Sequence, residues 1–162
     1  RTLTEKYGDA SFYESSANYQ LYFDRKKIAA KGITMKEIHA LIRPILMEFE
    51  GISDVILSDE IGASNLNHHL QELFKNGYHS VRSGDIQLVT MPGWIASSIT
   101  ATHGSTYNYD THIPLIFYGA GVAQGRTYER TGVADTAPTL AALLKILAPS
   151  GTMGEVIPAV IK

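Results

Sequence analysis

His103 is the side chain in this sequence with the clearest capacity for chemistry. It stands in the run ATHGS at residues 101–105, which follows neither a helical nor a strand period. A neutral imidazole is the commonest metal ligand, and the glycine after it lets the backbone approach a ligand closely. Loops beside sheet strands are frequent places for sites. We therefore take His103 as a candidate ligand, with an ordinary loop histidine as the alternative.

Asp110 and His112 form a second candidate pair. They lie two residues apart in the run YDTH at residues 109–112, so an extended backbone would place an acid and a base on one face. The alternative is a pair that orders the loop, in which Asp110 accepts backbone N–H groups and His112 is hydrogen-bonded in a semi-buried position. We favour this second interpretation, because loop carboxylates commonly bind nearby backbone.

The other histidines carry weaker signals. His39 falls on the polar side of an expected helix, which predicts a surface residue. His68 and His69 are adjacent on another expected helix and point about 100° apart, so they cannot both face one ion. His79 follows a helix end. The polar run RSGD at residues 82–85 precedes a strand and is expected to be a structural turn.

Composition and the remaining motifs exclude several classes of protein. The 162 residues contain no cysteine, which removes disulfides, Cys-ligated zinc and thiol nucleophiles. The sequence has no Gly-x-Ser-x-Gly, His-Glu-x-x-His or glycine-rich phosphate motif. With a net charge of −2 and no basic block longer than residues 25–27, we expect neither a nucleic-acid nor a membrane partner. No apolar run approaches the ~20 residues of a membrane span.

The elements that must position these residues alternate between strand and helix patterns. Thr34 and Glu37 form a capping-box pattern before apolar residues at helical spacing, and Pro44 is expected to kink or shorten that helix. The first half predicts a strand at 18–24, a helical turn at 25–31, a helix at 34–49, a strand at 54–57, a helix at 65–75 ended by Asn76-Gly77, and a strand at 86–90. The second half predicts a loop at 100–110, a strand at 115–118 buried on both faces, and a helix at 137–147 with Pro138 in its first turn. This alternation predicts an α/β fold, a layered sheet with flanking helices, in a single domain of residues 1–162.

Three ordered blocks of the sequence resemble a known family. They are RSGDI at 82–86, THGSTYNYDTHIPLIFYG at 102–119 and DTAPTLAALL at 135–144. Together they are similar to the C-terminal part of the alkaline phosphatase superfamily, close to bacterial zinc-dependent alkaline phosphatases related to the type I phosphodiesterase and nucleotide pyrophosphatase group. The resemblance covers residues 78–157 well and the first 77 residues loosely. One departure is Thr106, where many relatives have proline.

The resemblance implies a function for the parent enzyme. In the family, the histidine at the position of His103 binds one of two zinc ions, and a Thr or Ser nucleophile attacks a phosphate ester in an α/β fold. The resemblance also implies a secreted or periplasmic phosphomonoesterase. A phosphodiesterase or a phosphonate hydrolase of the same family, and a stand-alone non-catalytic domain, are the alternatives.

Most of the family's active-site residues have no counterpart in this sequence. The family supplies ligands from an Asp and a His four positions apart and from an adjacent Asp-His pair, and no Asp here is followed by His at either spacing. The chain also begins at Arg1 without an initiator Met. We therefore expect a C-terminal fragment with one metal ligand, no catalytic residue and no activity alone. Surfaces that faced the missing part are expected to drive self-association.

Overall fold

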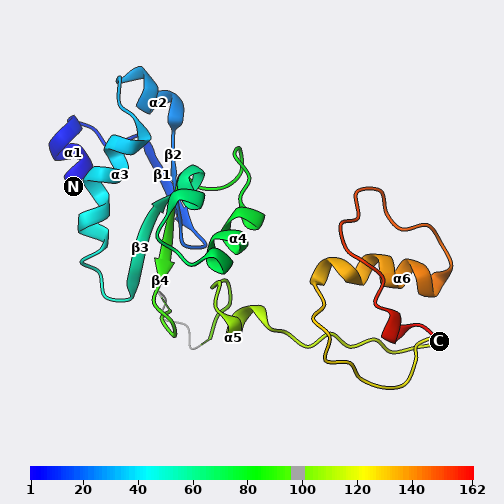
Figure 1. Cartoon of the computed structure of the whole chain (residues 1–162). Coiled ribbons are helices and arrows are strands. Elements are labelled where there is room, and N and C mark those ends of the chain that lie inside the picture. The colour runs from blue at the N-terminus through cyan, green and yellow to red at the C-terminus, as the bar shows by residue number, and fades with distance from the viewer. Residues whose placement is uncertain (96–100) are drawn as a thin grey trace. The chain divides into compact units, whose positions relative to one another are not determined.

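The computed structural model describes residues 1–95 and 101–162, which form two compact units, Arg1–His112 and Ile113–Lys162 (Figure 1). We describe each unit separately. The single domain expected from the sequence remains a prediction. Within the described ranges, no helix is long and apolar enough to cross a membrane.

The first unit is built on a four-stranded antiparallel sheet with the strand order β1-β2-β4-β3. The strands are β1 (Tyr13–Ala17), β2 (Gln20–Phe23), β3 (Ile52–Leu57) and β4 (Ile86–Thr90). The sequence predicted β3 and β4 closely, because both are apolar runs bounded by polar turns. It missed β1, whose residues are exposed along their whole length.

A two-residue turn joins β1 to β2 and explains why β2 begins two residues later than the strand predicted at 18–24. Asn18 and Tyr19 have φ angles of 49° and 60°, and Ala17 pairs with Gln20 on either side of them. Two successive positive φ values define the type I′ turn that suits the twist of a hairpin. Asparagine is common in this turn, whereas tyrosine is unusual in the left-handed region.

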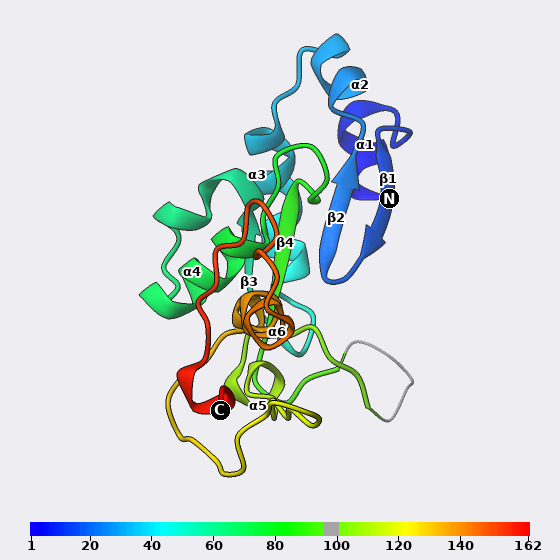
Figure 2. The same ribbon diagram turned by 90° about the vertical axis from the view of Figure 1, so that its right-hand side faces the viewer.

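Helices cover both faces of this sheet (Figures 1 and 2). The helices and 3-10 turns of the unit are α1 (Thr2–Tyr7), α2 (Arg25–Ala30), α3 (Met35–Leu46), η1 (Ser58–Ala63), α4 (His68–Gly77) and α5 (Asn108–Thr111). The capping box of Thr34 and Glu37 is confirmed at the start of α3, and the helix ends two residues after Pro44. Helix α4 begins later than predicted, with Asn67 as its N-cap, and it includes Gly77.

Successive side chains of β3 pack on opposite faces of the sheet, each against a different helix. Val55 and Leu57 pack in the cluster of α3, with Ile38 and Ile42, whereas Ile56 packs in a second cluster with Ile61. Phe74 of α4 adjoins that second cluster. Successive strand residues point to opposite faces, so a continuous apolar run is what a strand covered on both faces requires.

The second unit contains η2 (Val133–Asp135), α6 (Thr136–Leu144) and η3 (Pro158–Val160), with one isolated bridge between Val122 and Ile161. Helix α6 starts one residue before the prediction and ends three residues early, because Lys145 takes a left-handed conformation with φ of 58°. Pro138 lies in its first turn, as expected.

The predicted buried strand at 115–118 is wrong for this chain. No strand forms there among the described residues, and Ile116 is 83% exposed. A strand requires a neighbour for its backbone groups and cover for both faces. Among the described residues no strand pairs with this run, and Leu115, Ile116 and Tyr118 are exposed while Phe117 is half-buried.

Candidate functional site

His103 lies on an exposed loop of the first unit, two residues after Ala101 and before helix α5. Its ring is open to solvent, and the hydroxyl of Thr102 donates a hydrogen bond to the carbonyl oxygen of His103 at 3.3 Å. The next residue, Gly104, has φ of 111°, a conformation that favours glycine. The loop therefore presents the imidazole without enclosing it.

Asp110 orders this loop. Its Oδ2 accepts the backbone N–H of Ser105 at 2.6 Å, and this bond lowers the pKa of Asp110 from its ordinary value. The hydroxyl of Tyr107 donates to the carbonyl oxygen of Thr90 at 2.7 Å, which ties the loop to the end of β4. The loop-ordering interpretation of Asp110 is confirmed.

The alternative acid–base pair of Asp110 and His112 is not formed. Asp110 lies in helix α5, and His112 is its C-cap rather than part of an extended segment. Residues two apart on a helix do not share a face. His112 is also exposed, so the expected semi-buried position is wrong. Helix formation over Asn108–Thr111 accounts for both differences.

The residues around His103 do not fit a complete metal site. In residues 1–95 and 101–162, no group of three or more His, Cys, Asp or Glu side chains is placed to hold a metal ion. A catalytic zinc uses about three protein ligands. Among the described residues, the exposed imidazole of His103 is one possible ligand, and a complete zinc site would need further ligands.

Two of the other histidines have structural roles. Nε2 of His39 lies 2.8 Å from the carbonyl oxygen of Val55, so this half-buried ring links α3 to β3. The prediction of a surface residue is wrong here, because the sheet edge reaches the polar side of the helix. His79 Nδ1 accepts the N–H of Val81 at 3.2 Å. His68 and His69 are both exposed on α4.

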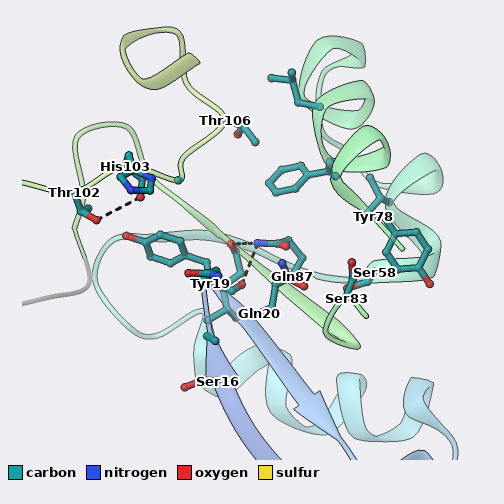
Figure 3. A pocket seen from close by; sticks show the side chains of 18 residues that line it. Ser16, Tyr19, Gln20, Ser58, Tyr78, Ser83, Gln87, Thr102, His103 and Thr106 are labelled. Carbon is teal, nitrogen blue, oxygen red and sulfur yellow. Dashed lines mark hydrogen bonds between the residues drawn. The ribbon is translucent and has the colours of Figure 1, made fainter. Parts of the chain in front are cut away.

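A cavity of about 770 Å³ lies beside His103 in the same unit. It is partly open to solvent and is lined by the β1–β2 hairpin, η1, α4, β4 and the loop at 102–106 (Figure 3). The lining side chains are mainly neutral polar, aromatic or aliphatic: Ser16, Asn18, Tyr19, Gln20, Ser58, Ile61, Leu73, Phe74, Tyr78, Ser83, Gln87, Leu88, Thr102, His103 and Thr106, with Ala17, Gly77 and Gly104. In Figure 3, His103 lies on one side of the view, Ser58 and Ser83 lie on the other, and Gln87 lies between them.

Comparison with known proteins decides the family. The chain is 38% identical over 155 residues to a Myroides odoratus protein named calcium-transporting ATPase, covering 94% of this chain and 28% of that protein. It is 35% identical over 161 residues to alkaline phosphatase PafA of Elizabethkingia meningoseptica, covering 98% of this chain and 30% of PafA. The crystal structure of wild-type PafA matches 99% of the chain with a TM-score of 0.88 at 35% identity, over 31% of that structure. The chain belongs to the alkaline phosphatase superfamily.

The chain matches only part of each relative. No protein-family model matches the chain. The chain spans less than a third of the length of each relative named above, so the activity of the whole protein is a matter for proposal. The sequence singled out His103 through its motif, and its role as a ligand stays a prediction. It did not single out the cavity residues Ser58 and Gln87. A usable signal was the glutamine inside the apolar run IQLV at 86–89, because a buried polar residue requires an explanation.

Proposed function

We propose that this chain forms part of a zinc-dependent phosphate monoester hydrolase and contributes His103 as one zinc ligand. The supporting observation is an exposed imidazole on a loop that Asp110 orders, in a chain 35% identical to an alkaline phosphatase along nearly its whole length. The three sequence blocks that resemble the family include this loop. A solvent-facing imidazole is free to bind a metal that further ligands complete.

The role of this chain in the reaction is to supply and position a ligand. When bound, zinc would stabilise the negative charge that develops on a phosphate ester. His103 would hold the metal through a ring nitrogen, and Asp110 would keep the loop backbone in place through Ser105. The nucleophile and the other ligands belong to residues outside this chain, so the chain alone is inactive. We also propose the periplasmic or extracellular location that the family resemblance implies.

A chimera tests this proposal. The 162-residue chain replaces the matching segment of PafA, and turnover of p-nitrophenyl phosphate is measured with added zinc. We expect activity in the chimera, and a loss of roughly a hundredfold or more in the His103→Ala chimera, because a metal ligand is removed. The His112→Ala chimera is the matched control, since His112 is also an exposed histidine of this region, and it should retain activity.

Three outcomes would contradict the proposal. Turnover by the isolated chain with zinc would show that the missing ligands are not needed. An active His103→Ala chimera would remove the role of the imidazole. An inactive parent chimera with a folded chain would favour the stand-alone, non-catalytic domain.

The same chimera separates the related reactions. Faster turnover of bis(p-nitrophenyl) phosphate than of p-nitrophenyl phosphate would indicate a phosphodiesterase, and faster turnover of a phosphonate monoester would indicate a phosphonate hydrolase.

A further inference from the structure

The cavity beside His103 has features of a binding site for a small molecule. Its volume of about 770 Å³ lies within the range of ligand pockets, roughly 300–1,000 Å³. Ile61, Leu73 and Phe74 supply apolar surface from η1 and α4. All of its walls belong to the first unit.

The charge of the lining defines the class of ligand. Among the described residues that line the cavity there is no Lys, Arg, Asp or Glu, and His103 stands at one side of it. A buried phosphate, carboxylate or ammonium group requires a partner of opposite charge or several strong hydrogen bonds. The cavity therefore suits an uncharged group.

Two buried polar side chains have bonding capacity that the described residues do not use. Ser58 is 5% exposed, and its hydroxyl has no hydrogen-bond partner there. Gln87 is 8% exposed, and its Nε2 donates to the carbonyl oxygens of Tyr19 and Leu88, each at 3.0 Å. Because both partners are carbonyl oxygens, the amide orientation is settled and Oε1 remains as an acceptor. Buried polar atoms in native proteins are almost always paired, so the unpaired hydroxyl of Ser58 points to a missing partner. Oε1 of Gln87 offers a further acceptor at the cavity.

The backbone holds these groups in place before any ligand arrives. The N–H of Ser58 donates to the carbonyl oxygen of Asp85 at 2.9 Å, and the N–H of Leu88 donates to the carbonyl oxygen of Tyr19 at 2.8 Å. Tyr19 keeps a left-handed conformation that glycine would adopt at lower cost. A large aromatic side chain at such a position is understandable where it forms part of a cavity wall.

We propose that this cavity binds an uncharged organic group that has an apolar face and hydrogen-bonding atoms. Ser58 and Gln87 bind its polar atoms, and Phe74 and Tyr19 contact its apolar face. This assignment rests on the proposed function: the bound group is the leaving group of the phosphate ester, and the phosphate lies beside His103. A nucleoside and an aryl glycoside both have this chemistry.

Binding to the full 162-residue chain tests the site independently of catalysis. Uridine and phenyl β-D-glucoside are titrated separately into the zinc-free chain, and ¹H–¹⁵N spectra record the binding. The probe that binds more tightly shows whether the site takes a nucleoside or an aryl glycoside. We expect saturable shifts at residues around the cavity, with a dissociation constant of about 1 mM or below. Phenyl β-D-glucuronide, which differs from the glucoside by a carboxylate, should bind at least about tenfold more weakly than the glucoside.

Point variants of the chain test which cavity residues contact the probe. Ser58→Ala should weaken binding of the better probe by about tenfold, because one hydrogen bond is lost. Ser80→Ala, an exposed serine that does not line the cavity, should leave it unchanged. Leu73→Trp should block binding by filling the space, and its dispersed spectrum would show that it is folded. The absence of saturable binding by either neutral probe, or equal binding of the glucuronide, would overturn the site.

The leaving-group role has a separate readout. In the PafA chimera, Ser58→Ala should lower kcat/KM for the phosphate monoester of the better probe by about tenfold while leaving kcat/KM for methyl phosphate unchanged. An equal effect on both substrates would overturn the leaving-group role. An inactive chimera whose chain still binds the probe would refute the proposed function and the leaving-group role, but not the cavity site.

Discussion

At the scale of single residues, Asp85 shows that local sequence predicts a turn but not the distant partners of its side chain. The run RSGD at 82–85 predicted a structural turn, and the structure confirms it. The carboxylate accepts the N–H of Phe23 at 2.8 Å and forms an ion pair with Arg25, both about 60 residues away in sequence. No local pattern indicates such distant partners. His103 was predicted as a metal ligand for a different reason, because the order of three sequence blocks carries more information than one residue type, and that role stays a prediction.

The two members of the Asp85 ion pair should differ in their effect on stability. Asp85→Ala removes the acceptor of a buried N–H, so we expect the free energy of unfolding to fall by about 3 kcal/mol. Arg25→Ala should cost about 1 kcal/mol or less, because the Arg25 side chain is 54% exposed and that of Asp85 is 6% exposed. Urea unfolding monitored by the fluorescence of Trp94, the only tryptophan, measures both. Equal losses would contradict the assigned role of Asp85.

At the scale of elements, local sequence signals predicted the helix and strand boundaries that local interactions set. The capping box sets the start of α3, and the apolar run bounded by turns sets β4. The hairpin turn was missed, because Tyr19 is not a residue that sequence rules associate with positive φ. The strand at 115–118 was wrong, because a strand depends on neighbours that composition does not reveal.

Asp135 makes the second unit sensitive to acid. Its carboxylate oxygens accept the N–H groups of Gly132 at 2.7 Å and Glu155 at 2.9 Å, which lowers the pKa of Asp135 below the ordinary 3.8. A lowered pKa in the folded state means that the stabilisation is present above pH 3.8 and is lost as the pH falls through the folded value. The amide proton shifts of Gly132 and Glu155, followed by NMR from pH 6 to pH 2, should titrate with a midpoint below 3.8. A midpoint at or above 3.8 would contradict the two bonds.

At the scale of the whole molecule, the two units differ in what they bury. The first unit has apolar clusters on both faces of its sheet, whereas the buried apolar side chains described in the second unit include Ala141 and Ile157. The second unit also exposes large apolar side chains at Ile116, Tyr118, Leu144, Leu147 and Met153. Exposed apolar surface of this kind is typical of an interface. Composition alone could not predict this, since the overall hydrophobic content of 44% is ordinary.

We propose that a second copy of the chain covers this apolar surface, so the chain should self-associate. Sedimentation velocity should show the average mass rising above that of the monomer as concentration increases, because burial of apolar area drives association. Ile116→Lys places a charge in the exposed apolar run and should shift the distribution towards monomer, while Thr131→Lys adds the same charge at an exposed polar position of the same unit and should not. A single monomeric species at high concentration would refute self-association. Equal effects of the two lysines would mean that net charge, rather than the apolar run, controls it.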